Sequence, residues 1–203
     1  MFRFDAVLCD LDGVLRRWDS PSMADLDAAH GLPAGTLAAA AFAPARLGPA
    51  ILGEHSDERW RAAVAEDLAG VCVTAAALVA EWTALTGAVD EAVAELLTEA
   101  RRHVPVVLVT NATTRLEADL ATLGVDGLVD HVVSSARVGF AKPDPRIYRA
   151  AAERAGVAVE RCLFVDDSAE NVAAAGALGM TGHHHVDPAD LRALLTTGRA
   201  GSW

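Results

Sequence analysis

The chain has 203 residues, of which 52% are hydrophobic, and it carries a formal net charge of −11 at pH 7. This length and apolar content suffice for one large domain or for a core with a modest insertion. The negative charge argues against nucleic acids and anionic membranes as partners, and no apolar stretch reaches the roughly 18 residues that a membrane span needs. A local cation can still reverse the field at one site, which leaves room for a small phosphorylated substrate.

The cysteines and the N-terminus indicate the compartment. Cys9, Cys72 and Cys162 are odd in number and follow no pattern, which indicates reduced thiols rather than a disulfide framework or a zinc site. The chain runs into an apolar segment without the pattern of a secretory signal. We therefore expect a cytoplasmic protein, either a monomer or a homodimer.

The first predicted strand covers residues 6–9 and leads directly into two acids, Asp10 and Asp12. A short apolar run close to the N-terminus is typical of a central strand that is covered on both faces. Ionised carboxylates in a protected site are costly unless a cation or strong donors compensate them. The pair therefore predicts a metal ion, a lysine or a reaction at this strand end, and Gly13 would let the chain turn away close to the site.

Residues 16–86 differ in character, since they are rich in alanine and read as helical. The helices expected in this segment cover residues 23–30, 34–42, 56–68 and 74–85. Ser56 is the expected N-cap of one of them, and we expect Trp60 and Trp82 to pack inside the segment. We assign residues 16–86 to a small helical cap, and residues 1–15 and 87–203 to the core.

From residue 90 onward helices and strands alternate. Strands are expected at residues 104–109, 131–134, 162–165 and 181–186, between helices at 90–103, 114–123, 145–155, 169–178 and from 188. This alternation predicts an α/β fold, a Rossmann-like parallel sheet with helices on both faces, interrupted after its first strand by the cap. In such sheets ligands bind at the carboxyl ends of the strands.

Polar residues follow four of these segments. They are Asp10 and Asp12, Thr110 and Asn111, Lys142, and Asp166 and Asp167. Each group alone is typical of a turn or a helix cap, but together and in this order they predict one site. Lys142 is the only lysine among 17 lysines and arginines, and its compact charge suits a position between an aspartate and a phosphate oxygen.

These segments resemble the motifs of the haloacid dehalogenase superfamily of phosphotransfer enzymes. The motifs are Asp-Leu-Asp-Gly-Val, a hydrophobic run ending in Thr-Asn, Lys-Pro-Asp, and Val-Asp-Asp-Ser with Asn171 beyond it. The insertion between the first two motifs resembles the helical type of cap. Residues 53–60 resemble a segment common among sugar-phosphate phosphatases and the phosphatase domains of epoxide hydrolases. Cys9 departs from the pattern, because an aromatic residue is frequent at that position.

The resemblance implies a role for each acid. Asp10 would be the nucleophile that forms an aspartyl phosphate, and Asp12 would be the general acid and then the general base. A Mg²⁺ ion would be held by the Asp10 carboxylate, the Asp12 backbone carbonyl and Asp167, with Asp166 in support. Which of Asp166 and Asp167 binds the ion directly stays open, with Asp167 favoured.

The resemblance also implies which groups hold the substrate. Thr110, the Asn111 backbone and Lys142 would hold the phosphoryl oxygens, with Lys142 also touching the nucleophile. Arg16 and Arg17 directly follow the catalytic turn and are candidates for the substrate entrance, the alternative being a solvated hinge. His183, His184 and His185 do not predict a metal site, because successive side chains of a strand point to opposite faces.

Together these features predict a Mg²⁺-dependent phosphomonoester hydrolase. Its substrate would be a small phosphorylated metabolite, with a sugar or polyol phosphate expected. The alternatives are a phosphomutase with the same site, a 2-haloacid dehalogenase and a catalytically silent binding protein. Asp12 disfavours the dehalogenase, since halide departure needs no proton and dehalogenating members generally lack this acid.

Overall fold

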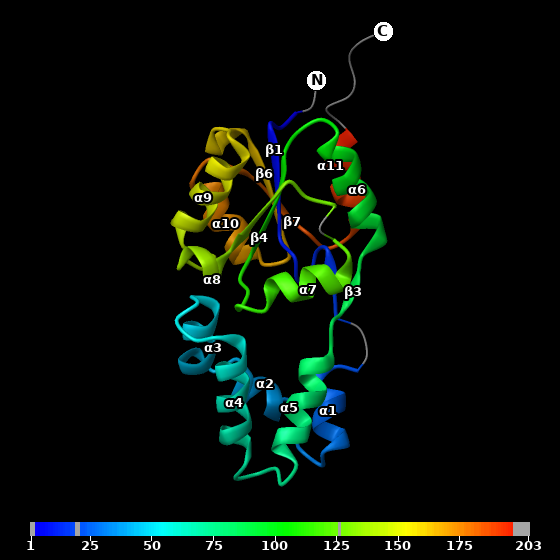
Figure 1. Cartoon of the computed structure of the whole chain (residues 1–203). Helices are drawn as coiled ribbons and strands as arrows, with labels where there is room; N and C mark the ends of the chain where they lie inside the picture. The colour runs from blue at the N-terminus through cyan, green and yellow to red at the C-terminus, as the bar shows by residue number, and fades with distance from the viewer. Residues whose placement is uncertain (1–2, 19–20, 126, 197–203) are drawn as a thin grey trace.

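A five-stranded parallel sheet forms the core of the protein (Figure 1), as seen in a computed structural model that describes residues 3–18, 21–125 and 127–196. The strand order is β5-β4-β1-β6-β7, so the first strand lies in the centre. The strands are β1 (Ala6–Cys9), β4 (Val106–Thr110), β5 (His131–Ser134), β6 (Cys162–Asp166) and β7 (Thr181–His184). The predicted Rossmann-like α/β fold is confirmed, while residues 1–2 and 197–203 of the predicted core lie outside the described part.

Helices cover both faces of the sheet because the strand side chains alternate between two apolar layers. Val7 and Cys9 pack in the layer with helices α6 (Glu91–Arg101), α7 (Leu116–Leu123) and α11 (Pro188–Thr196). Ala6 and Leu8 pack in the layer with α9 (Pro145–Ala155) and α10 (Ala169–Ala177). Figure 1 shows α9 and α10 on one side of the sheet and α6 and α11 on the other. This double burial explains the continuous apolar sequence of β1.

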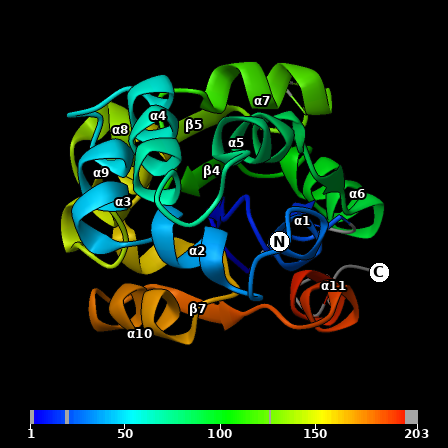
Figure 2. The same ribbon diagram turned by 90° about the horizontal axis from the view of Figure 1, so that it is seen from below.

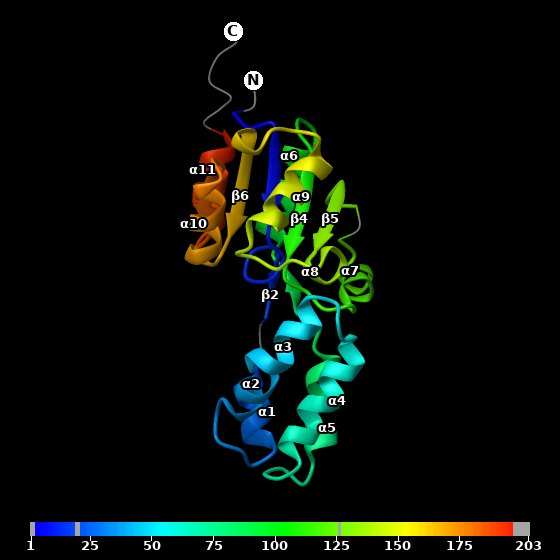
Figure 3. The same cartoon turned by 90° about the vertical axis from the view of Figure 1, so that its left-hand side faces the viewer.

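A helical cap lies beyond the carboxyl ends of the strands (Figures 1 and 3). Seen from the cap side, its helices lie in front of the sheet (Figure 2). Its helices are α1 (Met23–Ala29), α2 (Thr36–Ala41), α3 (Pro44–Ile51), α4 (Asp57–Leu68) and α5 (Ala75–Ala84). They share an apolar cluster of their own, in which Trp60 and Trp82 meet edge to face with ring centroids 5.1 Å apart. The division of the chain at residues 16 and 86 stays a prediction.

Several short elements were not predicted. The chain enters the cap through β2 (Arg16–Arg17) and leaves it through β3 (Ala88–Val89), and these two strands pair antiparallel. Helix α3 was missed because it contains Pro49, and proline in a sequence usually indicates that a helix does not continue. A short helix α8 (Ser135–Val138) and a 3₁₀ turn η1 (Val159–Arg161) are further elements that were not predicted. Among the described residues, no helix is long and apolar enough to cross a membrane.

Capping residues fix where the helices begin. The side chain of Ser56 accepts a hydrogen bond from the Arg59 backbone N–H at 3.3 Å, as predicted for the start of α4. Asp144 caps α9 in the same way, through the Arg146 N–H at 2.9 Å, and Pro145 occupies the first position of that helix. The loop that carries Lys142 is thereby anchored at its C-terminal side.

Hydrogen bonds fasten helices α4 and α5 of the cap to the core. The Thr113 hydroxyl donates to the Asp57 carboxylate at 2.7 Å, and the Asp57 backbone N–H donates to Thr114 Oγ1 at 2.9 Å. The Arg115 guanidinium also donates to the Thr83 carbonyl oxygen at 2.7 Å. The cap residues in these contacts belong to α4 and α5, and the core residues belong to the loop that follows β4. That loop therefore carries both a candidate phosphate-binding end and the cap anchors.

The contact between the end of α3 and the core predicts a strong preference for glycine at residue 53. Gly53 has φ +74°, and a Cβ atom there would lie 2.1 Å from the Ala136 carbonyl oxygen. We expect Gly53→Ala to lower the free energy of unfolding by about 1–3 kcal/mol, because it adds both backbone strain and a clash with backbone. Urea unfolding measures this change.

Gly176, in the last turn of α10, provides the matched control. Nothing lies within 4 Å of a Cβ atom placed there and alanine follows it in the chain, so Gly176→Ala should stabilise by about 0.5–1 kcal/mol. Equal effects of the two substitutions would show that the Gly53 contact is not tight.

Candidate active site

Three strand ends and the loop that carries Lys142 converge on a cavity of ≈ 430 Å³ beneath the cap. The strands β1, β4 and β6 are neighbours in the sheet, so their carboxyl ends share one edge. The cavity is lined by Asp10, Asp12, Gly13, Trp18, Thr110, Asn111, Lys142, Asp167 and Asn171. The structure thus brings together the residues predicted from four separate segments.

Lys142 forms an ion pair with two carboxylates at once. Its Nζ atom lies 2.7 Å from Asp10 Oδ1 and 2.7 Å from Asp166 Oδ2. Register explains the convergence, since Cys9 on β1 pairs with Val165 on β6 and the two acids are the next residues. The lysine side chain is only 2% exposed, so water screens these interactions little. The contact with Asp10 was predicted and that with Asp166 was not.

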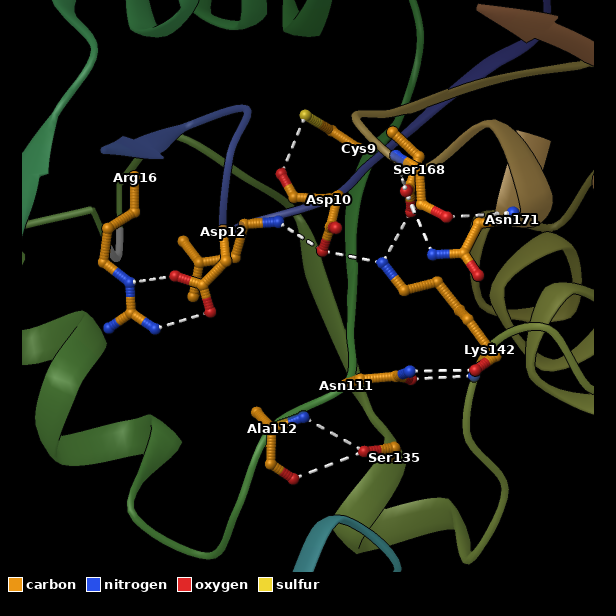
Figure 4. Close-up of polar contacts among 12 residues, drawn as sticks. Cys9, Asp10, Asp12, Arg16, Asn111, Ala112, Ser135, Lys142, Ser168 and Asn171 are labelled. Carbon is orange, nitrogen blue, oxygen red and sulfur yellow. Dashed lines mark hydrogen bonds and ion pairs between the residues drawn. The ribbon is translucent and has the colours of Figure 1, made fainter. Parts of the chain in front are cut away.

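Asn111 fixes the backbone of Lys142. Its Nδ2 atom donates to the Lys142 carbonyl oxygen at 2.9 Å, and the Lys142 N–H donates to Asn111 Oδ1 at 2.7 Å (Figure 4). Because the side chain of Asn111 holds the lysine loop, the backbone is the part of Asn111 that could contact a substrate. Thr110 is buried at the wall of the same cavity.

Asp166 and Asp167 are adjacent in sequence but differ in environment. Asp166 is fully buried, and its Oδ1 atom accepts hydrogen bonds from the Ser168 N–H at 2.8 Å and from Asn171 Nδ2 at 3.0 Å. Asp167 instead lines the cavity. Carboxylate oxygens of Asp10, Asp166 and Asp167 all lie within 4.8 Å of one another. Such a cluster of hard oxygen donors is the ligand set that Mg²⁺ prefers.

The electrostatics of the site also fit a divalent cation. The pKa of Asp10 is raised to about 7, chiefly because the carboxylate is buried; Lys142 opposes this rise and the nearby Asp166 adds to it. Burial, followed by the charge of Asp166, also raises the pKa of Asp167. Three carboxylates thus face one ammonium group, and a bound cation would balance the excess negative charge.

Gly13 allows Asp167 to approach the turn after β1. Its φ is +77°, and a Cβ atom there would lie 2.1 Å from Asp167 Oδ2. Any larger residue would therefore have to displace this carboxylate. The prediction that Gly13 turns the chain close to the site agrees with this geometry.

Asp12 points away from Asp10 and toward the start of the cap (Figure 4). The Arg16 guanidinium donates to both of its oxygens, at 2.6 and 2.9 Å, and Trp18 Nε1 donates to Oδ1 at 2.7 Å. Arg16 also lies 3.2 Å from Asp119 on α7 and 4.5 Å from the centre of the Trp18 ring. Arg16 therefore holds Asp12 by a bidentate contact, and it also lines a neighbouring cavity between the cap and the core.

Arg17 is a predicted site residue whose side chain lies away from the cavity around Asp10. Its side chain is 56% exposed and lies 3.6 Å from Asp90 at the start of α6. The physical reason is the strand β2, in which successive side chains point to opposite faces. Arg16 points inward and Arg17 points to solvent, which agrees with the alternative of a solvated hinge.

Several supporting contacts were not predicted from sequence. Ser135 contacts both backbone polar groups of Ala112, and Asn171 holds Asp166. His184 Nε2 lies 2.9 Å from the Asp167 carbonyl oxygen. Asn171 follows the last motif at a helical spacing, which is a usable signal, but Ser135 begins α8 and His184 ends β7, in other parts of the chain. Only the tertiary structure reveals their contacts.

The chain belongs to the haloacid dehalogenase-like hydrolase family, whose model matches residues 4–179. Phosphatase MT3486 of Mycobacterium tuberculosis is 45% identical over 87 residues, which are 41% of this chain and 40% of that protein. GMP/IMP nucleotidase YrfG of Escherichia coli is 37% identical over 75 residues, 36% of this chain and 34% of that protein. The matched segments thus span less than half of either curated relative.

A solved structure shows the same fold. It is a HAD family enzyme, bt-2542, from Bacteroides thetaiotaomicron in complex with magnesium and inorganic phosphate. The TM-score is 0.73 at 22% identity, with 89% of this chain and 93% of that chain covered. At this level of identity the likeness speaks for the fold alone.

The raised pKa of Asp10 predicts how stability depends on pH in metal-free protein. The folded state keeps the Asp10 proton up to about pH 7, whereas the ordinary value is 3.8. Between these values the folded state binds more protons than the unfolded state, so the Asp10 contribution to the free energy of unfolding falls as pH rises. Asp10→Asn should remove this fall and, at about pH 8 in EDTA, stabilise by on the order of 1–3 kcal/mol. If the free energy of unfolding, measured with urea, changed with pH in the same way in the variant and the wild type, the assignment of this pKa to Asp10 would be contradicted.

Proposed function

We propose that this protein is a Mg²⁺-dependent phosphomonoester hydrolase that acts on a small phosphorylated metabolite. The observation that carries the proposal is the buried ion pair of Asp10 with Lys142 and Asp166, next to the cavity-facing Asp167. A cation-balanced carboxylate at a strand end is suited to nucleophilic attack on phosphorus. The names of the two curated relatives, a phosphatase and a nucleotidase, support the same class of reaction.

In this proposal the Asp10 carboxylate attacks the phosphorus atom and forms an aspartyl phosphate, while the alcohol departs. Water then attacks the phosphorus and regenerates Asp10 with release of inorganic phosphate. Lys142 favours the ionised form of Asp10 against the effect of burial and holds the carboxylate in place, since its Nζ lies 2.7 Å from Asp10 Oδ1. With Thr110 and the Asn111 backbone N–H, it would also hold the phosphoryl oxygens while charge redistributes.

The residues that would hold Mg²⁺ are Asp10, the backbone carbonyl of Asp12, and Asp167. Asp166 would support from behind, because its oxygens already accept hydrogen bonds from Lys142, Ser168 and Asn171. When bound, the ion would neutralise charge on the phosphoryl oxygens and on the carboxylates. The glycine at residue 13 leaves Asp167 the space that this arrangement needs.

Asp12 would donate a proton to the departing alcohol and later take one from the attacking water. Arg16 and Trp18 hold its carboxylate to one side, 2.6 and 2.7 Å from their donor atoms. The side chain therefore has to turn toward the leaving oxygen when substrate is bound. Arg16 acts here as a positioning residue, because it touches Asp12 rather than the reacting atoms.

The first test of the proposal is Asp10→Asn. An amide is a poor nucleophile, so turnover of p-nitrophenyl phosphate with Mg²⁺ should fall below about one percent of wild type. Borohydride added during turnover should reduce the acyl phosphate of the wild type, and mass spectrometry should locate the modified residue at Asp10. Asp67→Asn, in an exposed ion pair of the cap, is the matched control and should keep full activity.

Failure to trap any adduct, together with activity in Asp10→Asn, would contradict the proposed nucleophile. Release of inorganic phosphate separates the hydrolase from a phosphomutase, which would keep the phosphate in organic form. An inert protein in the same assay would favour the silent binding protein.

The role of Asp12 is tested by the leaving group. A simple alkyl alcohol needs a proton to depart, whereas p-nitrophenolate does not. Asp12→Asn should therefore slow alkyl phosphate hydrolysis by about 10²–10⁴-fold and p-nitrophenyl phosphate hydrolysis far less, with Mg²⁺ affinity retained. An equal loss for both substrates would contradict the acid–base role, because it would point to a purely structural function.

A further inference from the structure

A second cavity, of ≈ 510 Å³, lies between the cap and the core. It shares the wall residues Asp12, Trp18 and Asn111 with the cavity around Asp10. A phosphate ester bound at Asp10 would therefore extend its alcohol part past Asp12 into this space. The volume lies within the usual range of about 300–1,000 Å³ for sites that bind small molecules.

The cap side of this cavity is largely apolar. Its wall includes Trp18, Phe42, Leu47, Ile51 and Trp82. Trp18 and Phe42 are each 50% exposed, which places them among the most exposed large apolar side chains in the described part of the chain. Neither side chain is a member of the apolar cluster of the cap, and both lie on the wall of this cavity. Covering such an apolar surface with a ligand removes it from water, which favours binding.

The polar side chains of the wall are already paired with one another. Arg61 lies 2.7 Å from Asp57, and Arg115 lies 2.8 Å from Asp119. Arg16 is held by Asp12 and Asp119. The arginines among the described wall residues are thus neutralised within the protein, so a second phosphate or a carboxylate on the substrate would find no free cation among them.

Hydroxyl groups of a substrate would also find few hydrogen-bond partners on this wall. Thr113 donates to Asp57, the Ser22 hydroxyl contacts Asp25, and the Asn111 side chain is bonded to the Lys142 backbone. The carboxylates on this wall already accept hydrogen bonds from arginine and threonine side chains, and most of the remaining wall is aromatic or aliphatic, so a polyol placed here would lose many of its hydrogen bonds with water. Burying a hydroxyl group without a partner is unfavourable, whereas burying methylene groups is favourable.

We propose that the substrate's alcohol part is an uncharged, largely apolar alkyl or aryl group, bound in the cavity between cap and core. This inference rests on the proposed phosphomonoester hydrolase activity and replaces the expected sugar or polyol. The phosphate would bind at Asp10 and Lys142, and the hydrocarbon body would lie against Phe42, Leu47 and Ile51. The cap therefore selects by the removal of apolar surface from water rather than by hydrogen bonding.

A homologous series of esters tests this inference directly. Ethyl, butyl and hexyl phosphate are primary alkyl monoesters with similar leaving groups, so they differ mainly in the apolar surface that they bury. Each fully buried methylene is worth about a fourfold gain in affinity, and we expect kcat/KM to rise at least about twofold per methylene. Propyl phosphate against glycerol 1-phosphate keeps the carbon skeleton constant, and we expect the propyl ester to be preferred by about tenfold or more, since each unpaired buried hydroxyl carries a penalty.

Wall variants give an independent measurement. Phe42→Ser should raise KM more for hexyl phosphate than for ethyl phosphate, by about five- to tenfold, because only the longer chain reaches that wall. Val73, which is fully exposed and lies outside the cavity wall, provides the control, and Val73→Ser should leave the whole series unchanged.

Two failures are distinguishable. If p-nitrophenyl phosphate is hydrolysed in an Asp10-dependent manner but glycerol 1-phosphate or glucose 6-phosphate surpasses hexyl phosphate, the apolar inference is overturned while the hydrolase stands. If no ester, p-nitrophenyl phosphate included, releases phosphate with Mg²⁺, the proposed function itself is overturned, and the inference falls with it. A kcat/KM that does not change along the alkyl series also overturns the inference.

Discussion

One ammonium group between two buried carboxylates is the interaction on which this site depends. Lys142 lies 2.7 Å from both Asp10 and Asp166 in an environment that water scarcely reaches. Removal of the lysine would leave two buried carboxylates uncompensated, and breaking a buried ion pair in this way typically costs about 3–5 kcal/mol. The contacts of Asn111, Ser168 and Asn171 serve this group, because each holds a member of the triad or its backbone in place. The sheet register supplies the geometry, and the single lysine supplies the charge.

The loop that holds the lysine segment also links the core to the cap. The loop after β4 begins with Asn111, which holds the lysine loop, and continues through Thr113 and Arg115, which fasten α4 and α5. A few successive residues thus organise the proposed phosphate site and the position of the cavity above it. The cap contributes apolar wall and the core contributes charge, so the two chemistries meet at Asp12 and Trp18.

Much of this arrangement can be predicted from sequence because it depends on local order. Apolar runs ending in polar residues mark the strand ends, and parallel strands bring those ends to one edge. The remainder depends on contacts between distant segments. The ion pairs of Lys142 with Asp166 and of Arg16 with Asp12 could not be predicted, because several other acids were equally possible partners by their spacing in the sequence. Pro49 conceals α3, and β2 and β3 are only two residues long each. The apolar character of the cavity wall likewise emerges only when five helices are assembled, since Phe42 and Ile51 are unremarkable in the sequence of the cap.

The strand pair β2 and β3 has a consequence for how the molecule works as a machine. The chain passes from core to cap through Arg16 and returns through Val89, and these residues pair directly. Arg16 also grips the Asp12 carboxylate with two hydrogen bonds. A movement of the cap about these two strands would therefore pull on the side chain that is proposed to deliver the proton. One guanidinium group joins the connection between core and cap to this acid, so a change in the position of the cap would also change the position of the proton donor.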